Sequence, residues 1–241
     1  SDLRFLSGFN VKKAGSGTWV VGGANTDETF KGVIDDYDQA HSHPGKTSIE
    51  KQGSGEWRLT GKNTYSGTTQ IKAGTLIVNG QHTGTGAVTV AAGATLAGKG
   101  SLAATVTVNG ILQIGDTLKT DKGLTFNAGL KLGSKAILKL NETMAEATHN
   151  DGEQIQAFTG TVTGTFAEIQ PATPGEGQTW DTTLLYTKGI LKVVGDPVSG
   201  ITTFTTVGTP LKVEYYTLQG ERVAHPGSGL YMIRVTMPDG T

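Results

Sequence analysis

The sequence predicts an all-β chain that folds as a single-stranded parallel β-helix, followed by a small antiparallel β unit. Three observations lead to this prediction. Glycine accounts for 36 of the 241 residues, roughly twice its usual share. Apolar residues recur at intervals of six through the middle of the chain, and near the C-terminus a two-residue alternation replaces that rhythm. Short repeated units bury their apolar faces by stacking on one another, so such a chain is expected to form a solenoid.

The six-residue rhythm runs from Val90 to Leu138, and each of its steps is called a hexad here. Eight of its nine positions are apolar: Val90, Leu96, Leu102, Val108, Ile114, Thr120, Phe126, Leu132 and Leu138. Most of these residues are preceded by another apolar residue two positions earlier. Apolar residues at i and i+2 suit a short strand with one buried face, and three such strands would close a coil of three hexads. We therefore expect Val90, Val108 and Phe126 to stack in one column inside the coil.

An antiparallel meander is the main alternative, because short strands separated by Gly or Asn-Gly also suit hairpins. A meander, however, has no reason to keep one phase over nine successive steps. The parallel β-helix is therefore the preferred prediction. Strict hexads are typical of left-handed coils, so the rhythm by itself leaves the handedness open.

A longer motif occurs twice in the first third of the chain. Residues 15–26 read Gly-Ser-Gly-Thr-Trp-Val-Val-Gly-Gly-Ala-Asn-Thr, and residues 53–80 begin Gly-Ser-Gly-Glu-Trp-Arg-Leu-Thr-Gly-Lys-Asn-Thr. The two copies align Trp19 with Trp57. This pattern resembles the passenger-associated repeat of bacterial autotransporters and related surface proteins. The resemblance implies right-handed coils and a secreted or cell-surface location associated with the outer membrane of a Gram-negative cell, but it names no substrate.

The chain divides into three parts. Residues 1–196 are expected to form the β-helix, with a polar loop at 35–50 and a terminal cap in its last segment, 177–194. Residues 197–209 are expected to form a linker, because Pro and Gly interrupt the pattern there. Residues 210–241 alternate in the manner of a separate small antiparallel sheet.

The C-terminal part carries its own recognisable pattern. Its marks are Tyr216, Gly220, Arg222, Val223, Gly229, Leu230 and Tyr231. This pattern resembles the C-terminal sorting and attachment domain of exported surface proteins of the Bacteroidetes type. That family ends with one more strand rich in Lys and Val, which does not follow Thr241, so we expect the sorting or anchoring unit to be incomplete. The resemblance implies that an export machinery is a partner of this unit.

Composition argues against several classes of function. The 20 basic and 21 acidic residues nearly cancel, so no overall field favours nucleic acid. No cysteine is present, which removes disulfides and thiolate metal sites. No apolar run is long enough for a membrane span. We therefore expect no cofactor, no nucleic-acid partner and no membrane-spanning segment.

Residues suited to catalysis are sparse. Parallel β-helices that degrade polysaccharides need acids and bases clustered on one strand face. From Gly84 to Asp116, however, the charged side chains are only Lys99 and Asp116 itself. The outward threonines of this stretch are ordinary β-formers: Thr89, Thr95, Thr105 and Thr107. The sequence thus identifies no catalytic residue and predicts that the chain is not an enzyme.

One acid and histidine cluster is a candidate for a divalent cation. It lies in the polar loop and consists of Asp35, Asp36, Asp38, His41 and His43. Its spacing lacks the Asp-x-Asp-x-Asp-Gly pattern of a calcium loop, so a solvated loop without metal is expected. Three isolated histidines are expected at the surface: His82, His149 and His225.

Aromatic side chains could offer another route to a ligand, because sugar rings stack on outward-facing Trp or Tyr. Trp19 and Trp57 occupy equivalent places in the two motif copies, so both are expected at the same structural position, packed on a neighbouring coil. Trp180 and Tyr186 are expected to pack in the cap. The sequence therefore identifies no ligand-binding residue.

These features predict a non-catalytic, exported cell-surface stalk or adhesin-like module that forms the C-terminal part of a larger protein. The alternative is an extracellular β-helix that binds or degrades glycans, with its site in the loop of residues 35–50 or in another part of the parent protein. A hexapeptide-type acyltransferase with a histidine base is a third reading of the six-residue rhythm. That class has neither the tryptophan motif nor the sorting-like tail. Surface or host glycans are the expected partners under the second reading.

Overall fold

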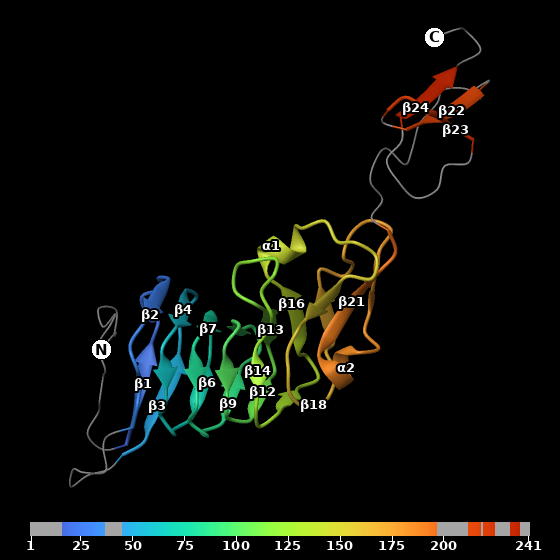
Figure 1. Cartoon of the computed structure of the whole chain (residues 1–241). Coiled ribbons are helices and arrows are strands. Elements are labelled where there is room, and N and C mark those ends of the chain that lie inside the picture. Colours follow the sequence, from blue (N-terminus) through green and yellow to red (C-terminus); the bar gives the residue numbers. More distant parts are fainter. Residues whose placement is uncertain (1–15, 37–44, 197–211, 218, 225–231, 237–241) are drawn as a thin grey trace.

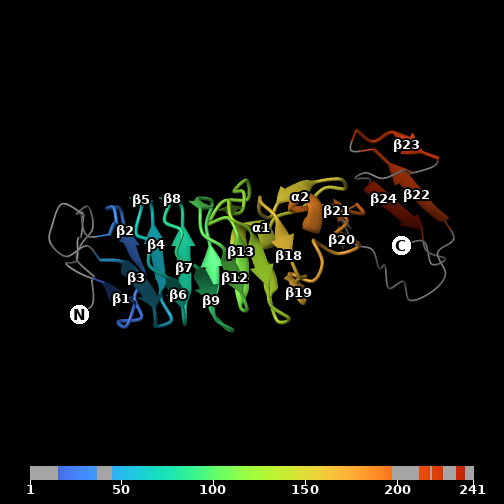
Figure 2. The ribbon, with the colours of Figure 1, turned by 90° about the horizontal axis from the view of Figure 1, so that it is seen from below.

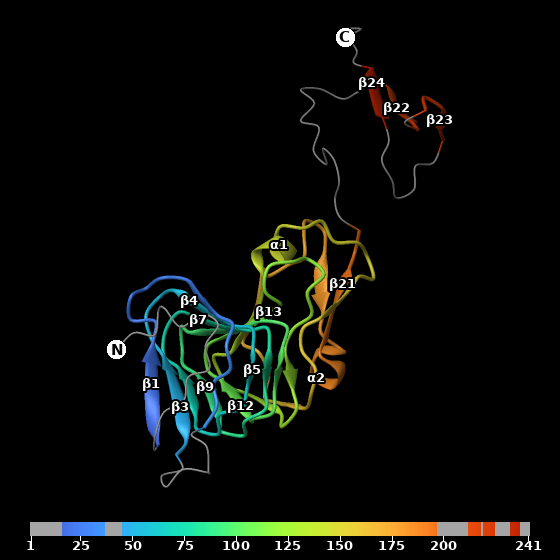
Figure 3. The same ribbon diagram turned by 60° about the vertical axis from the view of Figure 1, so that its left-hand side comes forward.

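A computed structural model describes residues 16–36, 45–196, 212–217, 219–224 and 232–236. Its first part, up to residue 170, is a parallel β-helix, which confirms the predicted fold class. The chain winds repeatedly through three parallel sheets, here called walls 1, 2 and 3, so that strands of successive coils lie side by side (Figures 1 and 2). Figure 3 shows the coils superposed, with the walls on different sides of the lumen.

Walls 1 and 2 each contain seven strands, and wall 3 contains four. Wall 1 consists, in spatial order, of β1 (Gly17–Val21), β3 (Thr47–Lys51), β6 (Thr69–Ile71), β9 (Val88–Val90), β12 (Val106–Val108), β15 (Leu130–Leu132) and β18 (Val162–Thr163). Wall 2 consists of β2 (Glu28–Phe30), β4 (Glu56–Leu59), β7 (Thr75–Val78), β10 (Thr95–Ala97), β13 (Ile111–Ile114), β16 (Ile137–Leu140) and β19 (Glu168–Gln170). Wall 3 consists of β5 (Lys62–Asn63), β8 (Gln81–His82), β11 (Ser101–Leu102) and β14 (Thr125–Phe126).

The strands form because each offers alternate apolar residues to the lumen. In β9, Val88 and Val90 are buried and Thr89 between them is exposed. In β13, Leu112 and Ile114 are both fully buried. Glycine is required where neighbouring coils approach closely. At Gly84, a Cβ would lie 1.7 Å from the carbonyl oxygen of Tyr65. One continuous apolar core therefore runs through the coils.

Coil length varies along the solenoid, so the predicted uniform coil of three hexads is wrong. On wall 1, one coil runs from Val88 to its register partner Val106, which is three hexads. The next coil runs from Val106 to Leu130, which is four. Val90 does stack on Val108, as predicted. Phe126, however, lies in wall 3 beside Leu102, and Val108 stacks instead on Leu132.

The coil length changes because of an insertion after Ile114. After Ile114 the chain leaves the solenoid in a loop, and the hexad residue Thr120 is an exposed part of that loop. The loop lengthens its coil by one hexad relative to the preceding coil. Apolar residues therefore still recur every six positions after the insertion, but each later hexad lies one wall earlier than a uniform coil would place it, as Phe126 does on wall 3 instead of wall 1.

The two motif tryptophans do not occupy the same structural position. Trp19 lies on wall 1 beside Ile49, whereas Trp57 lies on wall 2 between Glu28 and Leu76. The first coil is complete at Ile49, so the further step along the chain to Trp57 passes from one wall to the next. Both side chains are only 8% exposed, so neither offers an outward platform for a sugar ring.

Two of the three histidines expected at the surface are buried instead. His82 is 4% exposed and stacks on Tyr65, with ring centroids 4.2 Å apart. His149 is 1% exposed, lies 2.8 Å from the carbonyl oxygen of Met144 through Nε2 and packs edge-on against Trp180. His82 has polar neighbours in the sequence but lies at an inward position of β8, where inward and outward residues alternate, and His149 is buried in the loop between α1 (Glu142–Ala145) and β17 (Gln154–Gln156). His225 lies outside the described residues.

Acidification is expected to destabilise the solenoid through His82. Neither ring nitrogen has a partner at hydrogen-bond geometry in the described part of the chain, and burial lowers the pKa of the imidazole against a smaller opposing effect of the Asn63 backbone. A depressed folded-state pKa means that stability is complete above the unfolded value of about 6.5 and is lost as the pH falls below it. Urea unfolding between pH 7.5 and 5 should show this loss in the wild type and a smaller one in His82→Leu. Equal slopes for the two proteins would contradict the assignment.

A buried lysine interrupts the apolar column of wall 1. Lys51 stacks between Val21 and Ile71 and is fully buried. Its ammonium group donates hydrogen bonds to three turn carbonyls, those of Gln52 at 2.6 Å, Gly53 at 3.0 Å and Ala73 at 3.3 Å. Burial lowers the pKa of this amine. The lysine thus ties together the turns that connect walls 1 and 2 in adjacent coils.

The last coil is covered by a small antiparallel sheet. This sheet contains β20 (Thr179–Asp181), β21 (Ile190–Val194) and β17 (Gln154–Gln156), and it is accompanied by α2 (Leu185–Lys188). Phe158, Phe166 and Leu191 join it to the core, and Tyr186 accepts a hydrogen bond from the Phe166 amide at 3.1 Å. Trp180 donates to the Pro171 carbonyl at 2.8 Å. The segment predicted to cap the solenoid therefore packs as expected for Trp180 and Tyr186.

A second antiparallel sheet lies in the C-terminal part, as predicted. It contains β22 (Lys212–Tyr216), β23 (Arg222–Val223) and β24 (Met232–Thr236), with β22 in the centre. Glu214 pairs with Lys212 at 2.7 Å and with Arg222 at 3.3 Å. The predicted linker, 197–209, lies outside the described residues. In the described part of the chain, no helix is long and apolar enough to cross a membrane.

A polar cleft on wall 2 as the candidate functional site

The insertion after Ile114 builds a polar structure on the outer face of wall 2. We call residues 115–123 the Asp116 loop. It lies beside the ends of β7 and β10, where the Gly98 amide donates to the Gly115 carbonyl at 2.9 Å. Ile77 and Ala97 point away from the lumen in these strands but are only 1% and 0% exposed. The loop thus covers an outward apolar patch as well as carrying charged groups.

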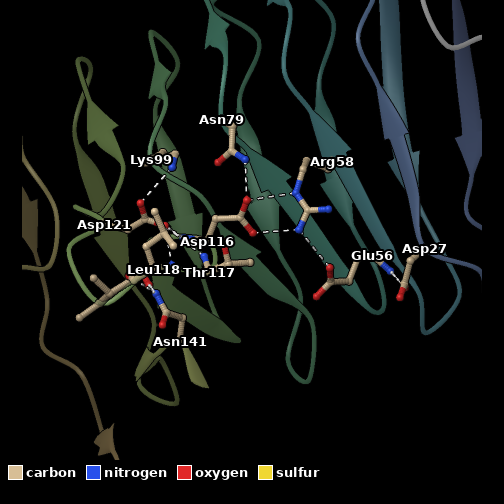
Figure 4. Close-up of polar contacts among 11 residues, drawn as sticks. Asp27, Glu56, Arg58, Asn79, Lys99, Asp116, Thr117, Leu118, Asp121 and Asn141 are labelled. Atoms are coloured by element: carbon tan, nitrogen blue, oxygen red, sulfur yellow. Dashed lines mark hydrogen bonds and ion pairs between the residues drawn. The ribbon is translucent and has the colours of Figure 1, made fainter. Parts of the chain in front are cut away.

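Asp116 anchors the loop to two neighbouring coils (Figure 4). Its carboxylate accepts hydrogen bonds from Arg58 Nε at 3.1 Å and Nη2 at 2.9 Å, and from Asn79 Nδ2 at 2.7 Å. Burial raises the pKa of Asp116, but the bonds from Arg58 and Asn79 outweigh it and hold the pKa below its usual value. The group is therefore a charged anchor, and its oxygens are committed to protein partners.

Asp121 holds the loop in shape (Figure 4). One carboxylate oxygen accepts the backbone amides of Asp116, Thr117 and Leu118, each at 3.1 Å, and the other pairs with Lys99 at 2.9 Å. Burial raises the pKa of Asp121, but the bonds from Lys99 and the three amides outweigh it and lower the pKa to about 2. Asp121 therefore accepts loop amides that a helix or sheet would otherwise pair with backbone carbonyls.

The loop is also bonded to the segment that follows β16. Asn141 donates from Nδ2 to the carbonyls of Ile114 and Leu118, both at 3.2 Å, and its Oδ1 accepts the Met144 amide at 2.9 Å. Asn141 therefore caps the short helix α1 (Glu142–Ala145) while holding the loop. On the other side, Lys119 donates to the Thr148 carbonyl at 2.7 Å.

A cleft of about 270 Å³ lies among the Asp116 loop, α1 and the outer face of wall 2. Its lining is polar throughout: Glu56, Arg58, Thr75, Thr95, Gln113, Asp116, Thr117, Lys139, Glu142 and Thr143. We call it the outer cleft. A shallower hollow lies on wall 1, lined mainly by Ser, Thr and Gly of β1, β3 and neighbouring turns. The outer cleft is the better candidate, because charged and amide groups from several strands and a helix converge on it.

The chemistry of the outer cleft favours binding over acid–base catalysis. Asp116 is held ionised, and Glu56 lies 3.4 Å from the guanidinium of Arg58. Glycoside hydrolysis needs a carboxyl group that stays protonated near neutral pH, which calls for burial away from cations. The described residues also include no group of three or more His, Cys, Asp or Glu side chains that could hold a metal ion.

The acid and histidine cluster proposed from sequence is only partly described. Asp36 accepts the Thr47 amide at 2.8 Å and the Ser66 amide at 3.0 Å, so it joins two coils. Asp35 accepts the Thr47 hydroxyl through its backbone carbonyl at 3.0 Å. Asp38, His41 and His43 lie outside the described residues. The predicted loop of residues 35–50 is also too long, because β3 begins at Thr47 and pairs with β1.

Two residues of the site stand out in the sequence, although the site itself does not. Lys99 and Asp116 were the isolated charges in an otherwise uncharged stretch, and both now make ion pairs with distant partners. Arg58 and Asp116 are 58 positions apart, so no local spacing joins them. The usable signal was Thr120, where the apolar rhythm fails beside a charged segment.

The match to a known family lies in the first coils. Residues 11–32 and 49–78 match the family model of the Passenger-associated-transport-repeat. The chain is 43% identical over 65 residues to the Adhesin BmaC autotransporter of Brucella suis biovar 1 (strain 1330), a stretch that covers 27% of this chain and 2% of that protein. No solved structure matches the chain. The N-terminal coils therefore carry an autotransporter passenger-type repeat, as the sequence motif indicated.

Proposed function

We propose that this chain is a non-catalytic, exported cell-surface module that serves as a stiff stalk in a larger adhesin-like protein. The observation that carries the proposal is the continuous stack of parallel coils, closed at its C-terminal end by the β17–β21–β20 sheet. Such a stack transmits force through backbone ladders and holds neighbouring domains apart. The passenger-type repeat and the relative named as an adhesin support the surface role.

The absence of catalysis is part of the proposal. Carboxylates of the Asp116 loop are used to hold the loop, and both have pKa values below their ordinary range. They are therefore poor proton donors near neutral pH. The glycan-degrading alternative would need a different acid, and Glu56 and Glu142 are the remaining carboxylates of the outer cleft.

The C-terminal sheet is proposed to be the sorting or anchoring unit recognised by an export machinery. Its support is the three-stranded antiparallel fold together with the sequence pattern around Tyr216, Gly220 and Arg222. A unit of this kind would place the stalk outside the outer membrane.

Surface display tests this function directly. An epitope inserted at the exposed turn of Gly93, where a side chain would meet no neighbour within 4 Å, should be labelled on intact cells that express the parent gene. Deleting residues 212–236 should abolish this labelling and leave a folded solenoid inside the envelope, because each coil is stabilised by its neighbours. The intact tagged protein is the control. An unlabelled intact protein would contradict the surface role, and a displayed deletion variant would contradict the sorting role.

A further inference from the structure

Three polar side chains line the outer cleft without a protein partner. Gln113, Lys139 and Glu142 make no side-chain hydrogen bond or ion pair in the described part of the chain, and all three line the cleft. Arg58 and Asp116, by contrast, are committed to each other. An amide, an ammonium group and a carboxylate are thus held by strands and a helix with their bonding capacity unused. Glu142 is exposed and the other two are half-exposed, so water satisfies these groups in the free protein and a polar ligand can take the place of that water.

The floor of the outer cleft presents a regular row of oxygen atoms. Thr95 on β10 is the direct register partner of Thr75 on β7, and Thr75 is the partner of Glu56 on β4. Adjacent strands in a sheet are about 4.8 Å apart, so these groups recur at that spacing across the floor. Hydroxyl groups both donate and accept, which suits a ligand whose own groups do the same.

The charges of the outer cleft exclude several ligand classes. Arg58 pairs with both Asp116 and Glu56, so with Glu142 and Lys139 the lining carries three carboxylates against two cations. A phosphate, a uronate or a sulfated sugar would therefore meet more negative than positive charge. No apolar residue of the described chain lines the cleft, so it offers no pocket for a lipid or for a peptide's apolar anchor.

We propose that the outer cleft binds a neutral or amino-bearing saccharide. Vicinal hydroxyl groups would bond to Glu142, Gln113 and the floor threonines, and an amino group would pair with Glu56. Since no aromatic side chain of the described residues lines the cleft, recognition depends on hydrogen bonds and the affinity for one sugar unit is weak. This inference goes beyond the stalk role, because a stalk without a ligand would still be displayed.

Titration of the full chain with small saccharides tests the inference. The probes are lactose and N,N′-diacetylchitobiose as neutral sugars, glucosamine as an amino sugar, and glucuronic acid and N-acetylglucosamine 6-sulfate as anionic sugars. Chemical-shift changes in the ¹⁵N spectrum should saturate with at least one neutral or amino probe and be about tenfold weaker with the anionic ones. Gln113→Ala and Glu142→Gln should each weaken binding by about tenfold, which is the effect of losing one good hydrogen bond.

A matched control lies on the same helical segment. Glu146, like Glu142, is exposed at α1 but does not line the cleft, so Glu146→Gln should bind like the wild type. Unchanged thermal midpoints would show that the variants are folded. The inference is overturned if no probe saturates, if anionic probes bind better, or if Gln113→Ala and Glu142→Gln bind normally. New reducing ends in the disaccharide titrations would instead contradict the non-catalytic role, so the two failures are distinct.

Discussion

Val108→Asp is expected to unfold the solenoid or to destabilise it by several kcal/mol. Val108 is fully buried in the lumen and stacks between Val90 and Leu132. An aspartate there would bury a carboxylate among aliphatic side chains with no charged partner, or would have to remain protonated. It would also remove the contacts of the valine with both adjacent coils. Chemical denaturation monitored by circular dichroism measures the loss.

The control for this variant is Thr107→Asp, one residue earlier in the same strand. Thr107 is on the outward face of β12, so its replacement keeps the charge change and the poor strand propensity of aspartate but leaves the lumen intact. The expected loss is about 1 kcal/mol or less. Similar losses for the two variants would show that position 108 does not face an apolar lumen.

Asp121→Asn is expected to lower stability at neutral pH by about 2 kcal/mol, since the pKa of Asp121 is lowered in the folded chain and one pKa unit is about 1.4 kcal/mol. The pKa falls from an ordinary 3.8 to about 2. Because the folded-state pKa is depressed, the contribution is present above about pH 4 and is lost as the pH falls towards 2. The loss caused by the substitution should therefore shrink under acid.

The measurement is the difference in unfolding free energy between wild type and Asp121→Asn across that pH range. Most other carboxylates titrate alike in both proteins, so the difference reports on Asp121 together with a smaller change at Asp116, whose pKa the charge of Asp121 raises. Lys99→Met should reproduce part of the loss, because Lys99 pairs with Asp121 at 2.9 Å. A difference that stays constant from pH 7 to pH 2 would mean that the ionised carboxylate does not hold the loop.

The apolar rhythm predicted the fold because it records a physical requirement of stacked coils. Residues such as Val90, Leu96 and Leu102 face one lumen from three successive strands, and all three are buried. The rhythm could not reveal coil length, because a loop of one hexad around Thr120 keeps the same phase as a strand and its turn. The period therefore predicts which residues are buried, but it does not predict which residues stack on one another.

Buried polar groups were the least predictable part of the chain. Lys51 and His82 occupy positions where the pattern calls for an apolar residue, and their surroundings come from neighbouring coils. The same holds for the site, where Arg58, Asn79 and Asp116 meet only because coils of particular lengths stack in register. The sequence did show that charges are few between Gly84 and Asp116, but it could not show which distant groups those charges pair with.

Disulfide formation between engineered cysteines tests the coil register most directly, since the natural chain contains no cysteine. Thr107 is the register partner of Thr89 in the preceding coil and of Lys131 in the following one. In-register Cα atoms about 4.8 Å apart are within the range that a disulfide can bridge. The double variants Thr89→Cys/Thr107→Cys and Thr107→Cys/Lys131→Cys should therefore both oxidise readily, while Thr107→Cys/Thr125→Cys should not. If Thr107→Cys/Thr125→Cys oxidised rapidly and Thr107→Cys/Lys131→Cys did not oxidise, the register of the stacked coils would be contradicted.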